Sequence, residues 1–258
     1  MNPVFQRLEL LVGRDALDAL SRTHAAVVGI GGVGSWCAEG LARSGVGHIS
    51  LIDSDAVCVT NINRQVEALL STTGRNKVDV LRERIADINP RCRVSAHAAV
   101  FSRDTRDGFG IEPGDYVVDA IDSLSCKLDL IEFCAERGVK FFSSMGTSQK
   151  VDPTKLTVAG IWETRGCPLA RLVRQGLRAR GFTGTFPCVY SPERIPYRKE
   201  FAPSCGKGEC FCSKREDCSG PDWCAAKKVI NGSMVAVTAA AGMILASLVV
   251  RDVCGFAA

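Results

Sequence analysis

A run of glycines between an apolar segment and a helical pattern constrains the fold of this chain more than any other feature of its sequence. The apolar segment covers residues 25–30 (AAVVGI), and a helical pattern follows over residues 33–44. The glycines of this stretch are Gly29, Gly31, Gly32 and Gly34. Glycines let the backbone turn tightly from strand to helix and approach a phosphate, whose charge the helix amino terminus favours. The pattern therefore predicts a strand–turn–helix unit that binds a nucleotide.

Strand and helix patterns alternate through the first 150 residues. Further strands are expected over residues 48–52, 93–98, 115–121 and 140–144, and helices over 75–88 and 127–137. In the first of these helices, apolar residues recur at helical spacing, namely Val78, Leu81, Ile85 and Ile88. This alternation predicts an α/β fold of the doubly wound, Rossmann-like type, with a mostly parallel sheet and helices on both faces.

The remainder of the chain is less regular. A strand is expected over residues 155–161, a basic helix over 168–180, and a long loop rich in Pro, Gly and Cys over 187–222. An uncharged apolar stretch covers 229–250 and is rich in small residues. It is long enough to cross a bilayer, but small residues are also typical of a helix packed closely on a sheet. We interpret it as a buried C-terminal helix and expect no association with a membrane.

Charge is unevenly distributed along the chain. The formal net charge is only +4. Between residues 165 and 215, however, eleven basic residues face three acidic ones, so this window carries +8 and the rest of the chain −4. A basic segment on a mildly acidic body favours a phosphate-rich partner, and a solvated arginine-rich face is the alternative.

The cysteines and the N-terminal residues indicate the cellular compartment in which the protein works. The 13 cysteines are an odd number and too sparse for a small disulfide scaffold. Residues 1–20 carry five charged side chains and no apolar signal-peptide core. These features favour a reduced, cytoplasmic setting.

Charged side chains beyond the glycines indicate which nucleotide is bound. Asp53 ends the second strand 19 positions after Gly34, where a carboxylate can accept hydrogen bonds from ribose hydroxyls. A dehydrogenase would share that pattern. It would not need Arg64 and Lys77, because a planar guanidinium and a compact ammonium are suited to the oxygens of a triphosphate. The strand-end carboxylate of Asp122 can hold Mg²⁺ beside such a triphosphate.

At these residues the chain resembles the ubiquitin-activating (ThiF/MoeB/HesA-like) superfamily, whose members adenylate carboxylates with ATP. Within it, the chain is most similar to the tRNA threonylcarbamoyladenosine dehydratase branch, from about residue 5 to about residue 250. The stretches that carry the resemblance are GIGGVGSW at 29–36, NINRQ at 61–65, DAIDS at 119–123, SSMG at 143–146, DPTKL at 152–156 and PLARLVRQGLR at 168–178.

The resemblance implies roles for individual residues. It implies ribose binding by Asp53, in an acid-x-acid element completed by Asp55, and Mg²⁺ binding by Asp122. The nucleotide site would also include Asn61, Arg64, Gln65 and Lys77, with Arg64 and Lys77 catalytic. Arg7, in an N-terminal helix, would reach the ATP site of the second subunit of a homodimer. Residues 1–258 would then be one adenylation domain, with a nucleotide-binding half over 1–150 and a dimer and substrate half over 151–258.

The resemblance also implies a reaction. A threonine carboxylate on N6-threonylcarbamoyladenosine in tRNA would attack ATP, and ring closure would expel AMP, with net loss of water. Arg171, Arg174 and Arg178 share one face of the basic helix and are candidates for contacting tRNA near the anticodon. The alternative substrate is the C-terminal glycine of a ubiquitin-like sulfur carrier, and a third hypothesis is a non-catalytic nucleotide-binding protein. A sulfur-transfer protein is a further candidate partner.

Two features depart from a simple match. Five cysteines cluster in the expected loop, namely Cys205, Cys210, Cys212, Cys218 and Cys224, but no two have CxxC spacing. Metal binding, a redox role and a plain reduced loop all remain open for them. Relatives commonly carry Asp before the Pro of Gly166-Cys167-Pro168, so the role of that loop in substrate binding is open as well. The three histidines, His24, His48 and His97, have no catalytic spacing and are expected to be structural.

Overall fold

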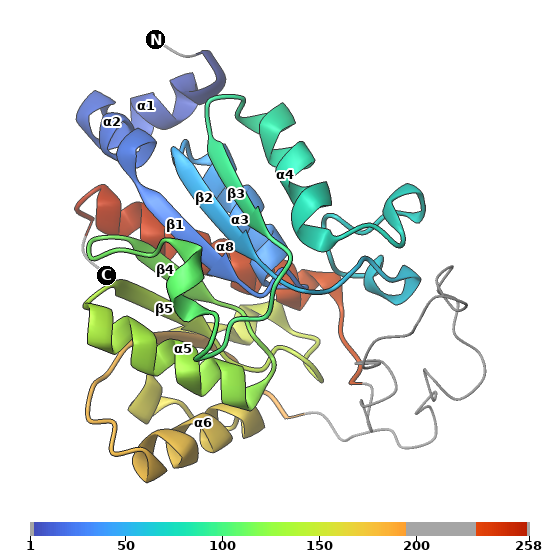
Figure 1. Cartoon of the computed structure of the whole chain (residues 1–258), viewed down its shortest axis with the longest axis vertical. Coiled ribbons are helices and arrows are strands. Elements are labelled where there is room, and N and C mark those ends of the chain that lie inside the picture. Colours follow the sequence, from blue (N-terminus) through green and yellow to red (C-terminus); the bar gives the residue numbers. More distant parts are fainter. Residues whose placement is uncertain (1–2, 195–230, 257–258) are drawn as a thin grey trace.

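A seven-stranded sheet forms the centre of the computed structural model, which describes residues 3–194 and 231–256 (Figure 1). Its strands are β1 His24–Val28, β2 His48–Ile52, β3 Arg93–His97, β4 Tyr116–Asp119, β5 Lys140–Ser144, β6 Thr157–Gly160 and β7 Pro187–Tyr190. Their order is β3-β2-β1-β4-β5-β7-β6, and all neighbouring pairs among these seven are parallel except β7–β6, which is antiparallel. The predicted doubly wound, mostly parallel sheet is confirmed.

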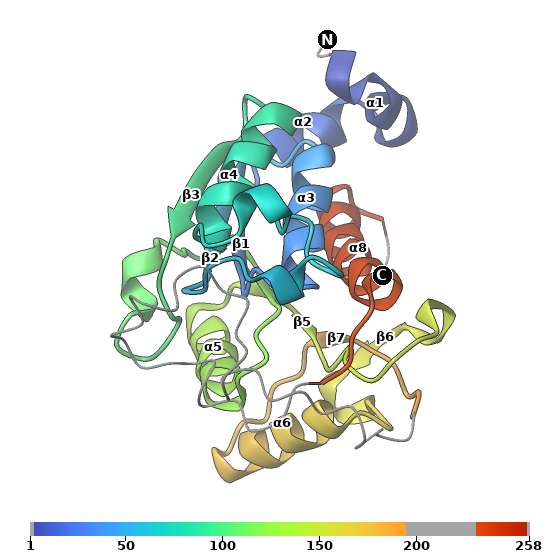
Figure 2. The same ribbon diagram turned by 90° about the vertical axis from the view of Figure 1, so that its right-hand side faces the viewer.

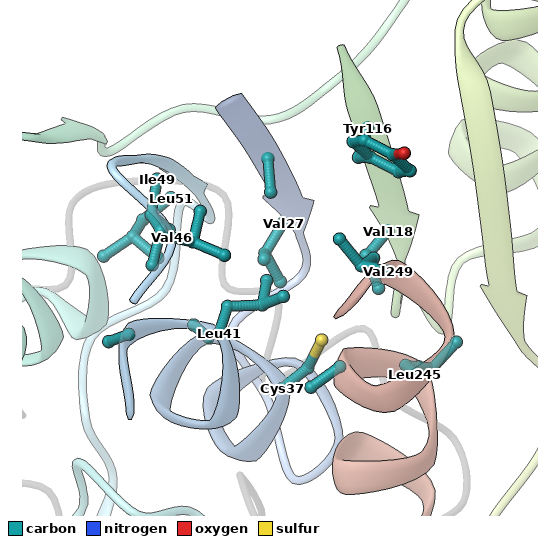
Figure 3. Packing of buried hydrophobic residues seen from close by; sticks show 14 of the residues in the cluster. Val27, Cys37, Leu41, Val46, Ile49, Leu51, Tyr116, Val118, Leu245 and Val249 are labelled. Atoms are coloured by element: carbon teal, nitrogen blue, oxygen red, sulfur yellow. The ribbon is translucent and has the colours of Figure 1, made fainter. Parts of the chain in front are cut away.

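Helices cover both faces of this sheet. The helices are α1 Gln6–Val12, α2 Arg14–Arg22, α3 Gly34–Arg43, α4 Lys77–Ile88, α5 Leu124–Arg137, α6 Pro168–Ala179 and α8 Val235–Val253. Of these, α1 and α2 lie at the amino ends of the strands (Figure 1). One apolar cluster joins α3, α4 and α8 to the sheet, and Figure 3 shows Cys37 and Leu41 of α3 packed with Leu245 and Val249 of α8. On the other face α5 packs on the sheet and α6 packs on α5 (Figure 2).

Helix α8 accounts for the uncharged apolar stretch near the C-terminus. It is long and apolar enough to span a membrane, but it packs along α3 inside the main cluster. Gly242 makes the close approach possible, because a Cβ there would lie 2.4 Å from the carbonyl oxygen of Val33. The expected buried helix is therefore confirmed, although it begins at Val235 rather than at residue 229.

The long loop predicted over 187–222 is wrong at its start. Residues Pro187–Tyr190 form β7, which pairs in parallel with β5 and in antiparallel with β6. Four residues are too few to show a period, and their strand conformation depends on neighbours that are distant in sequence. Residues 195–230, and with them the five clustered cysteines, lie outside the described residues.

Two of the histidines meet at the amino ends of their strands. The rings of His24 and His48 stack with centroids 3.9 Å apart, and His24 Nδ1 is hydrogen-bonded to the Asp115 carboxylate at 2.8 Å. The glycine turn follows the carboxyl end of β1, so this histidine pair lies at the other end of the strands, away from the turn. His97, on β3, packs its ring edge to face with Phe109.

The close packing of α8 on α3 makes Gly242 sensitive to substitution. We expect Gly242→Ala to destabilise the protein by about 1–3 kcal/mol, because backbone atoms of α3 must move to admit the methyl group. Urea unfolding of the purified protein measures this cost. The matched control is Gly108→Ala, where a Cβ would meet no atom within 4 Å. Equal midpoints for the two variants would contradict the packing argument.

Candidate functional site

The glycine turn between β1 and α3 lies at the carboxyl ends of the parallel strands. Gly29 has φ +91°, a conformation that other residues adopt at a cost, and its N–H donates to Ile52 O. A Cβ at Gly34 would lie 1.8 Å from the Gly29 carbonyl oxygen, so only glycine fits there. Gly31 and Gly32 lie between these two positions and face Gln65 and Arg64. The turn thus begins α3 directly against the end of β1.

Asp53, just past the end of β2, is joined to this turn. Its Oδ2 accepts a hydrogen bond from Ile30 N at 2.6 Å, and its Oδ1 accepts one from Asp55 N at 2.7 Å. Burial raises the pKa of the Asp53 carboxyl, while Lys77 and the two backbone donors oppose the shift. The side chain therefore sits at the edge of the glycine turn, where the sequence places a ribose-binding acid.

Lys77, the first residue of α4, brings a buried positive charge to the same place. Its Nζ donates to Asp55 Oδ2 at 2.8 Å, and only 4% of the residue is exposed. Burial alone would lower the pKa of Lys77, but Asp53 and Asp55 outweigh it, so the pKa is raised and the ammonium keeps its charge. Two carboxylates and one ammonium thus share one edge of the sheet.

The segment from Asn61 to Gln65 meets the glycine turn through its last two residues, because Gly32 faces Arg64 and Gly31 faces Gln65. Asn61 accepts a hydrogen bond from Cys58 N at 3.0 Å, which fixes the short 3₁₀ turn Val59–Asn61. Arg64 donates from Nη1 to Thr60 O at 2.9 Å, and its carbonyl accepts from Trp36 Nε1 at 3.0 Å. Burial lowers the pKa of Arg64.

Gln65 and Asp122 complete the predicted nucleotide set. Gln65 is buried, and its Oε1 has no hydrogen-bond partner among the described residues. Asp122 is exposed beyond the end of β4 and is close enough to Arg64 to raise the pKa of the guanidinium, against the effect of burial. The structure thus gathers Asp53, Arg64, Gln65 and Lys77 around the glycine turn, with Asp122 beside Arg64. Asn61 lies in the same segment as Arg64, and its carbonyl oxygen accepts the backbone N–H groups of Arg64 and Gln65.

A buried ion pair holds the strand ends that form this site. Lys127 Nζ lies 2.5 Å from Asp119 Oδ2, and both side chains are fully buried. Ser143 Oγ donates to the same carboxylate at 2.6 Å, and Lys127 also donates to Ser144 O at 3.0 Å. The pair therefore ties the loop after β4, which carries Asp122, to the end of β5. A carboxylate inside an apolar strand does indicate a buried partner, but the sequence does not say which residue supplies it.

Arg7 lies far from the glycine turn of its own chain. It is exposed on α1, which with α2 lies at the amino ends of the strands (Figure 1). It therefore contributes nothing to the nucleotide site of its own chain, and a role in a second subunit stays a prediction.

The arginines predicted to contact tRNA have different surroundings. Arg171 and Arg178 are exposed on α6, with the Arg178 guanidinium 5.3 Å above the Trp162 ring. Arg174 is partly buried and donates from Nη1 to the carbonyl and hydroxyl oxygens of Thr164. Arg174 is thus engaged within the fold, and Arg171 and Arg178 remain accessible.

The structure also describes Cys167, where the sequence departs from its relatives, and it allows a search for metal ligands. The departure at Cys167 has a local role, because its Sγ caps α6 by accepting from Ala170 N at 3.5 Å. Within residues 3–194 and 231–256, no group of three or more His, Cys, Asp and Glu side chains could hold a metal ion.

Comparison with known proteins places this arrangement in a family. The ThiF family model matches residues 5–257. The chain belongs to the ThiF family. It is 40% identical over 249 residues to the tRNA threonylcarbamoyladenosine dehydratase of Bacillus subtilis, covering 96% of this chain and 93% of that protein. It is 38% identical to the protein of the same name from Escherichia coli, covering 88% of each.

Solved structures agree with this assignment. The E. coli tRNA N6-threonylcarbamoyladenosine dehydratase in complex with ATP matches with a TM-score of 0.80 at 34% identity, over 97% of this chain and 93% of that one. A more distant structure, E. coli MccB with ATP, matches with a TM-score of 0.64 at 20% identity over 100% of this chain and 64% of that one, and shows a shared fold alone. The resemblance inferred from the sequence motifs is confirmed, and with it the class of ATP-dependent adenylating enzyme.

The buried Lys127–Asp119 pair is expected to be required for stability. Lys127→Met leaves an unpaired buried carboxylate and should cost about 3–5 kcal/mol. Chemical denaturation at neutral pH measures the loss. The control, Lys140→Met, removes an exposed ammonium from its pair with Asp252 and should cost less than about 1 kcal/mol. Similar losses of stability in the two variants would contradict the view that the Lys127–Asp119 pair is a buried pair on which folding depends.

Proposed function

We propose that this protein catalyses the ATP-dependent cyclisation of N6-threonylcarbamoyladenosine in tRNA, with loss of one water, through adenylation of the threonine carboxylate. One observation carries the proposal: Arg64 and Lys77 converge with Asp53 on the glycine turn, in a ThiF-family chain that spans nearly the full length of relatives with this activity in their names. The reaction belongs in the cytoplasm, where its tRNA and ATP are available.

Each site residue has a task in this reaction. The turn from Gly29 to Gly34 accommodates the phosphates at the start of α3, and Asp53, with Asp55 beside it, binds the ribose. Asn61, Arg64, Gln65 and Lys77 surround the triphosphate. Two anions meet when a carboxylate attacks the α-phosphate, and the charges of Arg64 and Lys77 offset their repulsion.

One carboxylate is enough for a magnesium ion that arrives with a triphosphate, because the phosphates and water supply its other ligands. Asp122 is an exposed carboxylate at the same edge of the sheet and close to Arg64, and carboxylate oxygens are ligands that Mg²⁺ prefers. A bound Mg²⁺ would neutralise charge on the departing pyrophosphate.

Ring closure needs little further help from the protein. Once the carboxylate is activated, a nitrogen of the same modification lies within reach and displaces AMP. Intramolecular attack of this kind is favoured by proximity, so no covalent bond to the enzyme is needed.

The sulfur-carrier alternative has weaker support. The E. coli molybdopterin-synthase adenylyltransferase is 31% identical over 120 residues, which is 46% of this chain. The tRNA-modifying relatives match nearly the whole chain, including the part after residue 150 that carries α6.

The proposed function is tested by mass spectrometry of tRNA nucleosides from cells with and without this protein. We expect the cyclised nucleoside to be lost without it, to return with the wild-type chain, and not to return with Lys77→Met. With purified protein, Lys77→Met should lower kcat/KM for the tRNA about 100-fold or more, because a charge beside the reacting phosphates is lost. An unchanged nucleoside profile without the protein would favour the sulfur-carrier alternative.

We further propose a homodimer in which Arg7 of one subunit completes the nucleotide site of the other. The support is its exposed position on α1, away from its own site. Arg7→Ala and Lys77→Ala should each be inactive alone. Mixed dimers contain one site with both residues intact, so subunit exchange should restore part of the activity. No recovery on mixing would exclude this role of Arg7.

The exposed arginines of α6 are proposed to bind tRNA phosphates. Neutralising Arg171 and Arg178 together should weaken tRNA binding and flatten its log–log salt dependence by roughly 0.7 to 0.9 for each contact removed. Gel-shift titrations across a salt series measure both quantities, and ATP affinity should not change. Arg93→Ala, which removes an exposed arginine at the amino end of β3, serves as the control. If the double variant retains the wild-type slope, α6 is not part of the tRNA surface.

A further inference from the structure

A buried carboxyl group without a hydrogen-bond partner lies beside the nucleotide site. Glu67 is 1% exposed, and neither of its carboxyl oxygens has a hydrogen-bond partner among the described residues. Other buried acids of the fold are paired: Glu39 binds Arg43 and Arg84, and Asp119 binds Lys127. An ionised carboxylate in such surroundings is costly, so this position favours the protonated acid.

The neighbours of Glu67 belong to the site itself. It is coupled electrostatically to the Lys77 ammonium on α4, to Asp53 after β2, and to Arg64. On the side of α3, the Ser35 hydroxyl lies close enough to lower the pKa of Glu67, but its geometry does not make a hydrogen bond to the carboxyl. The same hydroxyl accepts from Val66 N at 3.3 Å. The Lys77 ammonium already faces Asp53 and is bonded to Asp55. An ionised Glu67 would be a third carboxylate around that one ammonium.

We propose that Glu67 is a positioning residue whose proton controls the charge of the nucleotide site. While Glu67 is protonated, Lys77 is shared by two carboxylates and remains able to bind phosphate. When Glu67 loses its proton, a third carboxylate competes for the same ammonium and repels the triphosphate. This inference rests on one part of the proposed function, namely that Lys77 binds the phosphates of ATP.

The pH range of this control follows from the surroundings. Burial raises the pKa of the Glu67 carboxyl to about 7, Asp53 adds to the shift, and Lys77 and Ser35 offset it only in part. Below pH 7 the acid is neutral and the site is ready for ATP. Above pH 7 Glu67 loses its proton while the site is empty. Glu67 must then take up a proton from solution when ATP binds. ATP binding above pH 7 therefore takes up protons, and its affinity falls as the pH rises.

The test compares Mg²⁺–ATP binding by the wild type and Glu67→Gln, which keeps the shape of the protonated acid and cannot ionise. Calorimetry from about pH 6 to about pH 8.5 gives the dissociation constants, and buffers with different ionisation enthalpies give the proton uptake. The ratio of the wild-type to the variant constant should lie near 1 at about pH 6 and rise several-fold by about pH 8.5. Ionisation of ATP itself cancels in this ratio. Glu136→Gln, which removes an exposed carboxylate at the end of α5, should follow the wild type.

Two outcomes would overturn the proposal. One is a ratio that stays constant across the pH range, and the other is wild-type binding above pH 7 without proton uptake beyond that of ATP itself. The second measurement needs no variant, so it holds even if Glu67→Gln fails to fold, and Glu67→Met provides a second non-ionising side chain. A wild type that binds no ATP at any pH would instead contradict the proposed function. Tight, pH-independent binding would contradict this inference alone.

Discussion

Helix α3 begins directly against the end of β1, and most of the molecule is arranged around that turn. The contact between Gly34 and the Gly29 carbonyl leaves no room for a side chain. It sets the direction of α3, against which α8 packs through Gly242. The same turn presents backbone N–H groups at the start of α3 while Asp53 binds its Ile30 N–H. Packing on one face of the sheet and the proposed recognition of phosphate at the carboxyl ends of its strands therefore depend on one piece of backbone.

Positive and negative side chains lie close together at the carboxyl ends of the strands. Lys77 keeps its proton because Asp53 and Asp55 outweigh its burial, and the loop carrying Asp122 is held by the Lys127–Asp119 pair behind it. Attack of a carboxylate on a triphosphate needs positive charge beside the phosphates, and Asp53 and Asp55 already offset part of the charge of Lys77. A protonated Glu67 adds no third negative charge there, and its burial favours the protonated form.

The sequence predicted the elements that have strong local patterns. The strands over 48–52 and 140–144 coincide with β2 and β5, and the glycine turn and Asp53 lie where the motif places them. The short strand β7 was missed, since its conformation depends on β5 and β6 rather than on its own residues. Helices α4 and α5 begin at Lys77 and Leu124, against expected starts of 75 and 127, because an apolar period indicates that a helix is present but does not mark its first residue.

The roles of buried polar residues could not be predicted from spacing. Lys127 looks like the start of a helix in the sequence, and only the sheet shows that Asp119 is its partner. Likewise Glu67 follows the NRQ motif without any feature that marks it, and its lack of a hydrogen-bond partner appears only when α3 and α4 are packed together. Arg174 shows the reverse case, in which helical spacing predicted an exposed arginine and Thr164 engages it.

The central claim is that a carboxylate of the tRNA modification attacks the α-phosphate of ATP. The most direct measurement uses tRNA whose threonine carboxylate carries a heavy-oxygen label, incubated with ATP and the purified protein. Adenylation forms a bond between a carboxylate oxygen and phosphorus, and ring closure leaves that oxygen on the departing AMP. The account predicts one labelled oxygen in AMP for each cyclised nucleoside, as read by mass spectrometry. Cyclised product with unlabelled AMP would contradict it.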